Sequence, residues 1–144
     1  MDESTVLVKL LRPGARLPER ATPGSSGFDL YACLENDVEV TQQPVLIPTG
    51  LAMQVPAGFD AQIRPRSGLA RKGVIASFGT LDSDYRGELM VTLYTAAPGL
   101  THVVRHGDRI AQLVITRLAP VRLEASDALD DTERGAGGHG STGR

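Results

Sequence analysis

Cysteine is nearly absent: Cys33 is the single one among 144 residues. A lone cysteine excludes a disulfide within the chain and a metal cluster built from thiolates, and it is consistent with a reducing compartment. We expect Cys33 to be a small side chain of the core. Long apolar runs are also missing, because no stretch reaches the roughly 20 apolar residues of a membrane-spanning helix. With no signal peptide visible after the acidic residues 1–5, the sequence predicts a soluble, cytoplasmic protein without a membrane partner.

An excess of either charge is missing too. The 15 Lys and Arg residues nearly balance the 17 Asp and Glu residues, which leaves a net charge of -2. The chain as a whole is therefore not attracted to nucleic acid, and none is expected as a partner. Any anionic ligand must be bound by a local group of residues. The length fits one domain, since domains most often have about 100 to 150 residues.

Room for long helices is absent, because prolines stand at positions 44, 48, 56, 65 and 98. Short alternating segments such as 51–55 and 59–63 are separated by turn residues, a pattern typical of a closed or sandwiched β architecture. The sequence predicts strands at 6–11, 28–32, 38–40, 45–47, 51–55, 59–63, 74–76, 89–94, 102–104, 110–115 and 121–124. The single expected helix is one or two turns at 67–72, with Ser67 as its N-cap.

The composition changes at residue 126. Acidic residues precede Arg134, and the last ten positions contain five glycines. A Gly-rich end of this kind is usually a disordered terminus. It can also be an arm that closes over a ligand, because glycine amides can approach phosphate oxygens closely. We therefore divide the chain into a β domain at 1–125 and a C-terminal arm at 126–144.

Residues 79–87 read Gly-Thr-Leu-Asp-Ser-Asp-Tyr-Arg-Gly, between predicted strands at 74–76 and 89–94. A carboxylate in such a loop can act as a general base if a water lies within hydrogen-bond reach. Alternatively, Asp82 and Asp84 can shape a turn by accepting hydrogen bonds from nearby backbone amides. The loop is therefore a candidate catalytic segment with a purely structural alternative.

Two further polar features, the segment 64–68 and Gln112, are candidate ligand contacts. The segment 64–68, Arg-Pro-Arg-Ser-Gly, brings two arginines to the predicted helix start, which favours either a phosphate site or a solvated basic turn. Gln112 lies in an otherwise apolar strand, where its amide needs a partner that is either structural or a ligand oxygen. Both interpretations remain open for each position.

Taken together and in this order, five segments resemble the trimeric dUTPase family. They are 26–32, 65–70, 79–91, 107–113 and 134–143. The resemblance implies an all-β, jelly-roll-like β-barrel subunit with one short helix and a Gly-rich arm, assembled as a homotrimer with active sites shared between subunits. It also implies Mg²⁺-dependent hydrolysis of dUTP to dUMP and diphosphate. That reaction limits uracil incorporation into DNA and supplies dUMP for dTMP synthesis.

The resemblance also assigns roles to individual residues. Asp82 would activate the attacking water, and Asp29 would hold Mg²⁺ through water. Tyr85 would lie against the deoxyribose and exclude a 2'-hydroxyl. The implied phosphate contacts are Arg66, Ser67, Gly68 and Gln112, and the implied uracil contacts are Ala76, Gly79, Thr80, Leu81 and Met90.

In the arm, the resemblance implies that Arg134, Gly140, Ser141 and Thr142 contact the γ-phosphate and that position 139 covers the base. Most family members have phenylalanine there, whereas this chain has His139. An imidazole can still stack on uracil, so we expect closure to survive with a strength that depends on imidazole protonation. Asparagine is also common in the family at Ala76 and Thr95.

Two alternatives accompany this interpretation. A dCTP deaminase, monofunctional or bifunctional, shares the fold and part of the phosphate-binding sequence, but Tyr85 and the complete arm favour a dUTPase. A non-catalytic nucleotide sensor or regulator would not need a carboxylate at Asp82.

Overall fold

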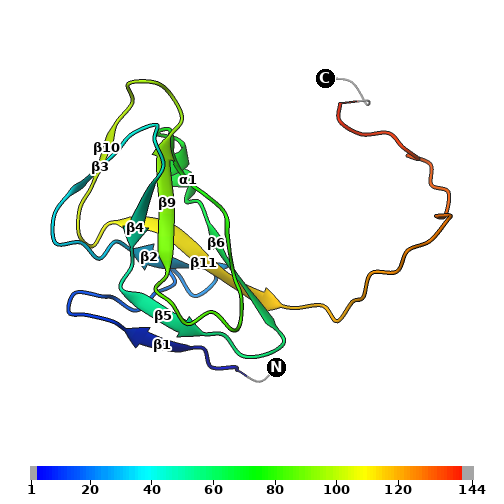
Figure 1. Cartoon of the computed structure of the whole chain (residues 1–144), viewed down its shortest axis with the longest axis horizontal. Coiled ribbons are helices and arrows are strands. Elements are labelled where there is room, and N and C mark those ends of the chain that lie inside the picture. The colour runs from blue at the N-terminus through cyan, green and yellow to red at the C-terminus, as the bar shows by residue number, and fades with distance from the viewer. Residues whose placement is uncertain (1–2, 141–144) are drawn as a thin grey trace.

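The computed structural model describes residues 3–140, and within them the chain is almost entirely β (Figure 1). The elements, in chain order, are β1 (Leu7–Leu10), β2 (Gly27–Tyr31), β3 (Val38–Val40), β4 (Val45–Pro48), β5 (Leu51–Gln54), β6 (Phe59–Arg64), α1 (Ser67–Ala70), β7 (Val74–Ala76), β8 (Gly79–Leu81), β9 (Met90–Thr95), β10 (His102–Val104) and β11 (Arg109–Arg117). The prediction of an all-β fold with one short helix is confirmed.

Antiparallel pairing organises these strands into small sheets. The largest has the order β2-β11-β6-β8, and a second has the order β4-β9-β7. Two-stranded sheets join β1 to β5 and β10 to β3. Strand β6 pairs with β11 along one edge and with β8 along the other. The residues of β11 and the residues of β8 therefore lie along opposite edges of β6.

Alternation along the strands builds the core between the sheets. On β9, Val91, Leu93 and Thr95 are buried, while the residues between them are partly exposed, as the sequence predicted. Buried Thr95 is satisfied by the fold, because its hydroxyl donates to the Leu100 carbonyl at 2.7 Å. Cys33 is buried, as predicted. Polar Thr95 is thus a structural member of the core.

Three local predictions were wrong. Residues 121–124 form no strand, because within residues 3–140 no strand pairs with them to complete a ladder. Ser67 is not the N-cap of α1: Arg66 occupies that position, with no side-chain capping hydrogen bond. Residues 79–81 are not loop but strand β8, whose pairing with β6 diverts the chain between β7 and β9.

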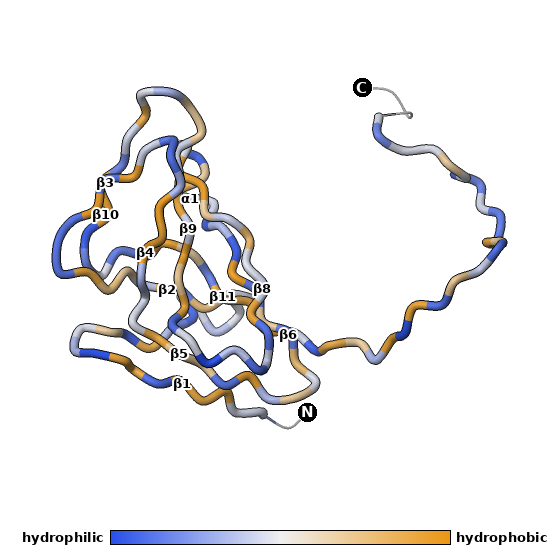
Figure 2. The backbone as a smooth tube through the Cα atoms, in the orientation of Figure 1, coloured by the Kyte–Doolittle hydropathy of each residue, from blue (hydrophilic) through white to orange (hydrophobic). Residues whose placement is uncertain are grey.

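Residues 118–140 lead away from the body of the molecule (Figure 1). Figure 2 shows apolar positions interspersed among polar ones along this segment. The side chains of Val121, Leu123 and Leu129 are 78%, 98% and 90% exposed. A single copy of the chain therefore leaves these apolar groups in water.

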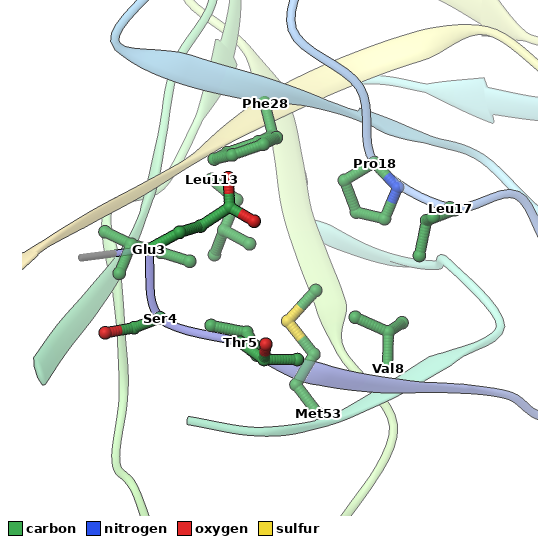
Figure 3. Close-up of a pocket in the computed structure, with 11 residues that line it drawn as sticks. Glu3, Ser4, Thr5, Val8, Leu17, Pro18, Phe28, Met53 and Leu113 are labelled. Carbon is green, nitrogen blue, oxygen red and sulfur yellow. The ribbon is translucent and has the colours of Figure 1, made fainter. Parts of the chain in front are cut away.

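An apolar cavity of about 300 Å³ lies between the N-terminal segment and the sheets (Figure 3). Its walls include Val8, Phe28, Met53 and Leu113, with Glu3 at one side. None of its lining residues belongs to the predicted site.

Among the described residues, no helix is long and apolar enough to cross a membrane.

Candidate active site

The loop that carries Asp82 connects two different sheets. Leu81, at the end of β8, and Leu89, just before β9, are both buried and hold the two ends of the loop. The Tyr85 amide donates to the Asp82 carbonyl at 3.0 Å, and the Arg86 guanidinium donates to the Ser83 carbonyl at 2.7 Å. Main-chain carbonyls thus accept the hydrogen bonds that close this turn.

The Asp82 side chain is left free for chemistry. Asp82 is exposed, and within residues 3–140 neither its carboxylate nor that of Asp84 accepts a hydrogen bond from the protein. The alternative in which these side chains shape the turn is therefore not what the structure shows. A carboxylate without protein partners can accept a proton from a bound water.

Asp82 lies at a cavity of about 250 Å³. The cavity is lined by Ile63, Gly79, Thr80, Leu81, Asp82, Tyr85, Glu88, Leu89 and Met90. The fold therefore brings the predicted catalytic residue together with five predicted nucleoside contacts. Ala76 is not among the lining residues, and its side chain is buried in the core, so only its backbone can serve the expected role.

The Tyr85 ring is fixed by its own loop. Its hydroxyl donates to the Glu88 carbonyl at 2.9 Å. A Cβ atom placed on Gly87 would lie 2.3 Å from the Tyr85 hydroxyl oxygen and 2.6 Å from Cζ. Among residue types, only glycine at position 87 leaves room for the ring in this place.

A second cluster surrounds Asp29 on β2. Its carboxylate oxygens lie 3.7 Å from Arg66 Nε and 3.8 Å from Arg109 Nη1. Arg66 also donates from Nη1 to the Arg109 carbonyl at 3.1 Å. With its side chain 16% exposed, Asp29 lies between two guanidinium groups at the start of α1.

Gln112 joins this cluster through the sheet. It lies opposite Asp29 on β2 and opposite Arg64 on β6, so the three residues share one face. Its Nε2 donates to the Pro65 carbonyl at 3.0 Å, next to Arg66. The amide therefore has a structural partner, and that bond links β11 to the segment entering α1.

The fold offers no reason for glycine at position 68. A Cβ atom there would meet no atom within 4 Å, and its φ lies outside the left-handed region. Glycine inside a helix costs about 1 kcal/mol relative to alanine. Gly79 is similar, because its Cβ would make only ordinary contacts of 3.6 Å or more with Ile63. Packing within the chain therefore requires glycine at neither position.

The described part of the arm, residues 126–140, does not reach either cluster. Arg134 Nε donates to the Gly137 carbonyl at 2.5 Å, a contact within the arm itself. His139 has a positive φ of 50°. Gly140 is exposed at the end of the described range, and Ser141 and Thr142 lie outside it. The contacts predicted for Arg134, His139 and Gly140 therefore have no counterpart among the residues that the structure describes in a single copy.

The described residues of this site offer too few metal ligands to bind an ion without a bound substrate. Within residues 3–140, no group of three or more His, Cys, Asp or Glu residues could hold an ion. One carboxylate, Asp29, lies between two arginines. A single carboxylate between two cations cannot hold a divalent ion alone, so Mg²⁺ would have to take most of its oxygens from substrate phosphates and water.

Sequence reasoning missed three residues that the structure ties to the site: Arg12, Glu88 and Arg109. Arg109 lies inside one of the five segments, three positions before Gln112, and a basic residue in that segment was a usable signal. Arg12 gave no such signal, because its partner Glu88 is 76 positions away.

An antiparallel β subunit with an unbonded carboxylate in a cavity and an arginine cluster at a helix start has the equipment of a hydrolase for phosphorylated substrates. A sequence profile of the dUTPase family matches residues 14–143. The chain therefore belongs to the dUTPase family.

Relatives and solved structures agree. The chain is 47% identical to a deoxyuridine 5'-triphosphate nucleotidohydrolase of Maricaulis maris (strain MCS10), over 97% of this chain and 98% of the relative. It is 48% identical to the protein of that name from Treponema denticola, over 92% and 94% of the two chains.

Among solved structures, a mutant dUTPase of Staphylococcus bacteriophage 80alpha with dUpNHpp matches with a TM-score of 0.81 and 26% identity, covering 99% of this chain and all of that one. A mutant dUTPase from phage phi11 of S. aureus, which coordinates a structural Mg(II) ion, matches with a TM-score of 0.77 and 25% identity, covering 87% and 98%.

Proposed function

We propose that the protein hydrolyses dUTP to dUMP and diphosphate as a homotrimer, with Asp82 as the general base. The observation that carries this proposal is that Asp82, whose carboxylate has no hydrogen-bond partner within residues 3–140, lines one cavity with the predicted nucleoside contacts. The reaction would limit uracil incorporation into DNA and supply dUMP for dTMP synthesis. A cytoplasmic location is part of the proposal, and the free thiol of Cys33 is compatible with it.

In the proposed mechanism, Asp82 accepts a proton from a water as that water attacks the α-phosphorus. The bond from the α-phosphorus to the bridging oxygen breaks, and diphosphate leaves with its electron pair. Phosphoryl transfer of this kind depends mainly on positioning and on charge stabilisation. An exposed carboxylate held at a turn between two buried leucines meets the first requirement.

The Asp29 cluster would supply the second requirement, which is stabilisation of the phosphate charge. Arg66 and the amides at the start of α1 would bind phosphate oxygens, with Ser67, Gly68 and Gln112 beside them. When bound, Mg²⁺ would neutralise phosphate charge, with Asp29 holding one of its waters. The two guanidinium groups on either side of Asp29 keep its carboxylate oriented for that role.

Three observations support a shared site in a trimer. The Asp82 cavity and the Asp29 cluster lie toward opposite edges of β6, and no lining residue of the Asp82 cavity belongs to the Asp29 cluster. The arm leads away from the sheets that carry both (Figure 1). The apolar residues beyond β11 are exposed in one copy, as expected for a surface that another subunit covers.

Base and sugar selection would come from the Asp82 cavity. Backbone groups around Ala76 and from Thr80 to Asp82 would pair with uracil, next to Gly79, and Met90 would line the pocket. Cytosine would present an amino group to another donor, which is costly in a closed site. In the closed arm, Arg134, Gly140, Ser141 and Thr142 would contact the γ-phosphate, and His139 would stack on the base. The phage relative with dUpNHpp, a dUTP analogue, supports this choice of substrate.

Product analysis on dUTP, dCTP, dTTP and UTP with Mg²⁺ tests the proposal. We expect diphosphate release from dUTP alone, and formation of dUTP from dCTP would instead identify a deaminase. Asp82→Asn should still bind a non-hydrolysable dUTP analogue, while kcat falls by about a hundredfold or more. Unchanged turnover in that variant would remove Asp82 from its role, and a protein that binds dUTP without hydrolysing it would be a sensor.

A further inference from the structure

The loop that carries Tyr85 ends at a charged junction of three chain segments. Both carboxylate oxygens of Glu88 accept hydrogen bonds from the Arg12 guanidinium, at 2.8 Å from Nη1 and 2.8 Å from Nη2. The Gly50 amide donates to the same carboxylate at 3.1 Å. Glu88 thus ties the segment after β1 and the turn between β4 and β5 to the active-site loop.

The partners of Glu88 are themselves held in place. The Leu11 amide donates to the Gly50 carbonyl at 2.8 Å, which fixes the backbone next to Arg12. The Thr49 hydroxyl donates to the Leu89 carbonyl at 2.7 Å, next to Glu88. Gly50 has a φ of +72°, and a Cβ atom there would lie 2.8 Å from Ala15 Cβ. The junction therefore has little freedom to adjust.

Tyr85 depends on this junction through the backbone of the same residue. The Glu88 carbonyl accepts the Tyr85 hydroxyl hydrogen bond at 2.9 Å, and the ring lies over Gly87. Moving the Glu88 backbone would move the acceptor that holds the ring. Both Glu88 and Tyr85 line the Asp82 cavity, so such a movement would change the shape of the proposed sugar pocket.

The ion pair between Arg12 and Glu88 contributes little to the stability of the fold. The Arg12 and Glu88 side chains are 38% and 24% exposed, and partly exposed pairs contribute on the order of 0 to 1 kcal/mol. Its bidentate geometry instead fixes orientation, which a single contact does not. The Arg12 hydrogen bonds also lower the pKa of Glu88, with a smaller lowering from the Gly50 amide, so both interactions favour the charged carboxylate.

We propose that Arg12 and Glu88 are positioning residues that set the Tyr85 ring and thereby the discrimination between dUTP and UTP. This inference rests on the proposed function, since it assumes that the deoxyribose lies against Tyr85. Loosening the junction lets the ring move away from Gly87 and makes space for a 2'-hydroxyl. The rate with UTP then rises relative to the rate with dUTP.

The first test compares kcat/KM for dUTP and UTP in Glu88→Gln, Arg12→Met and the double variant. We expect the dUTP-to-UTP ratio to fall by about tenfold in each single variant, because misplacing a positioning group by roughly 1 Å can cost up to a hundredfold. The double variant should lose no more than either single one, since both remove the same interaction. Equal losses with both substrates, leaving the ratio unchanged, would show that the junction is only structural.

The chain offers a matched control in the exposed pair of Arg105 and Asp37. Their nitrogen and oxygen lie 3.6 Å apart, with side chains 73% and 59% exposed. Asp37→Asn and Arg105→Met make the same chemical changes as the test variants, outside the Asp82 cavity. We expect both to keep the wild-type ratio, and a similar fall in these controls would overturn the assignment.

A second measurement reports the environment of the Tyr85 ring without hydrolysis of any substrate. In protein labelled with ¹³C at tyrosine Cζ, the Tyr85 resonance should shift or broaden in Glu88→Gln and Arg12→Met but not in Asp37→Asn. An unchanged resonance in the test variants would overturn the proposal. A wild-type protein that fails to hydrolyse dUTP would refute the proposed function, whereas the Tyr85 resonance would still report whether the junction holds the ring.

Discussion

Replacing Gly27 by alanine tests how the phosphate cluster is assembled. Gly27 lies opposite Val114 in the pairing of β2 with β11. A Cβ atom on it would lie 2.3 Å from Gln112 Oε1, 3.0 Å from Cδ and 3.1 Å from Cβ. Since non-bonded atoms prefer separations of about 3.5 Å, the Gln112 amide must move by roughly 1 Å.

That movement breaks the hydrogen bond from Gln112 Nε2 to the Pro65 carbonyl, which measures 3.0 Å. Leaving a partly buried carbonyl without its partner costs about 1 to 3 kcal/mol. Each kcal/mol corresponds to a fall of roughly 2 to 4 °C in Tm for a protein of about this size. The segment before α1 also loosens, so we expect KM for dUTP to rise several-fold.

Thermal unfolding followed by circular dichroism measures the first effect, and steady-state kinetics measure the second. Gly24→Ala is the control, because a Cβ atom there meets nothing within 4 Å. That variant should match the wild type or be slightly more stable. The reasoning would be refuted if Gly27→Ala kept the wild-type Tm and KM while a crystal structure showed the Gln112 bond intact.

Three further predictions concern α1, the charged junction and the arm. Gly68→Ala should stabilise the free protein by up to about 1 kcal/mol yet weaken binding of a dUTP analogue, measured by calorimetry; equal affinity would mean that no ligand approaches Gly68. Because the folded pKa of Glu88 lies below its ordinary value, its stabilising effect is present above pH 4 to 5 and is lost as pH falls through the folded pKa. Urea unfolding should thus show a stability gap between wild type and Glu88→Gln at pH 7 that narrows as the pH falls below the ordinary pKa of a glutamate; a gap independent of pH would contradict the ion pair. Truncation before Arg134 should leave a folded trimer by light scattering with greatly reduced turnover, and full activity would show that the arm is dispensable.

Local patterns predicted much of the fold and of the candidate site. The strand with Leu89, Val91 and Leu93 on one face was predictable because alternation reflects the pleat of a half-buried strand. The segment around Asp82 and Tyr85 was predictable because its chemistry is contiguous in the chain. The prediction of a strand at residues 121–124 was wrong, because alternation describes one segment alone. A strand exists only where a partner completes its hydrogen bonds.

The sequence by itself determined the all-β class, the family resemblance and the identity of most candidate residues, because each of these depends on short stretches of chain. Only the tertiary structure decided that Arg12 holds Glu88 across 76 positions and that Gln112 bonds to the Pro65 carbonyl. It also decided that the Tyr85 ring lies over Gly87. These contacts join groups that no local pattern relates, and long-range pairing of strands is what brings them together.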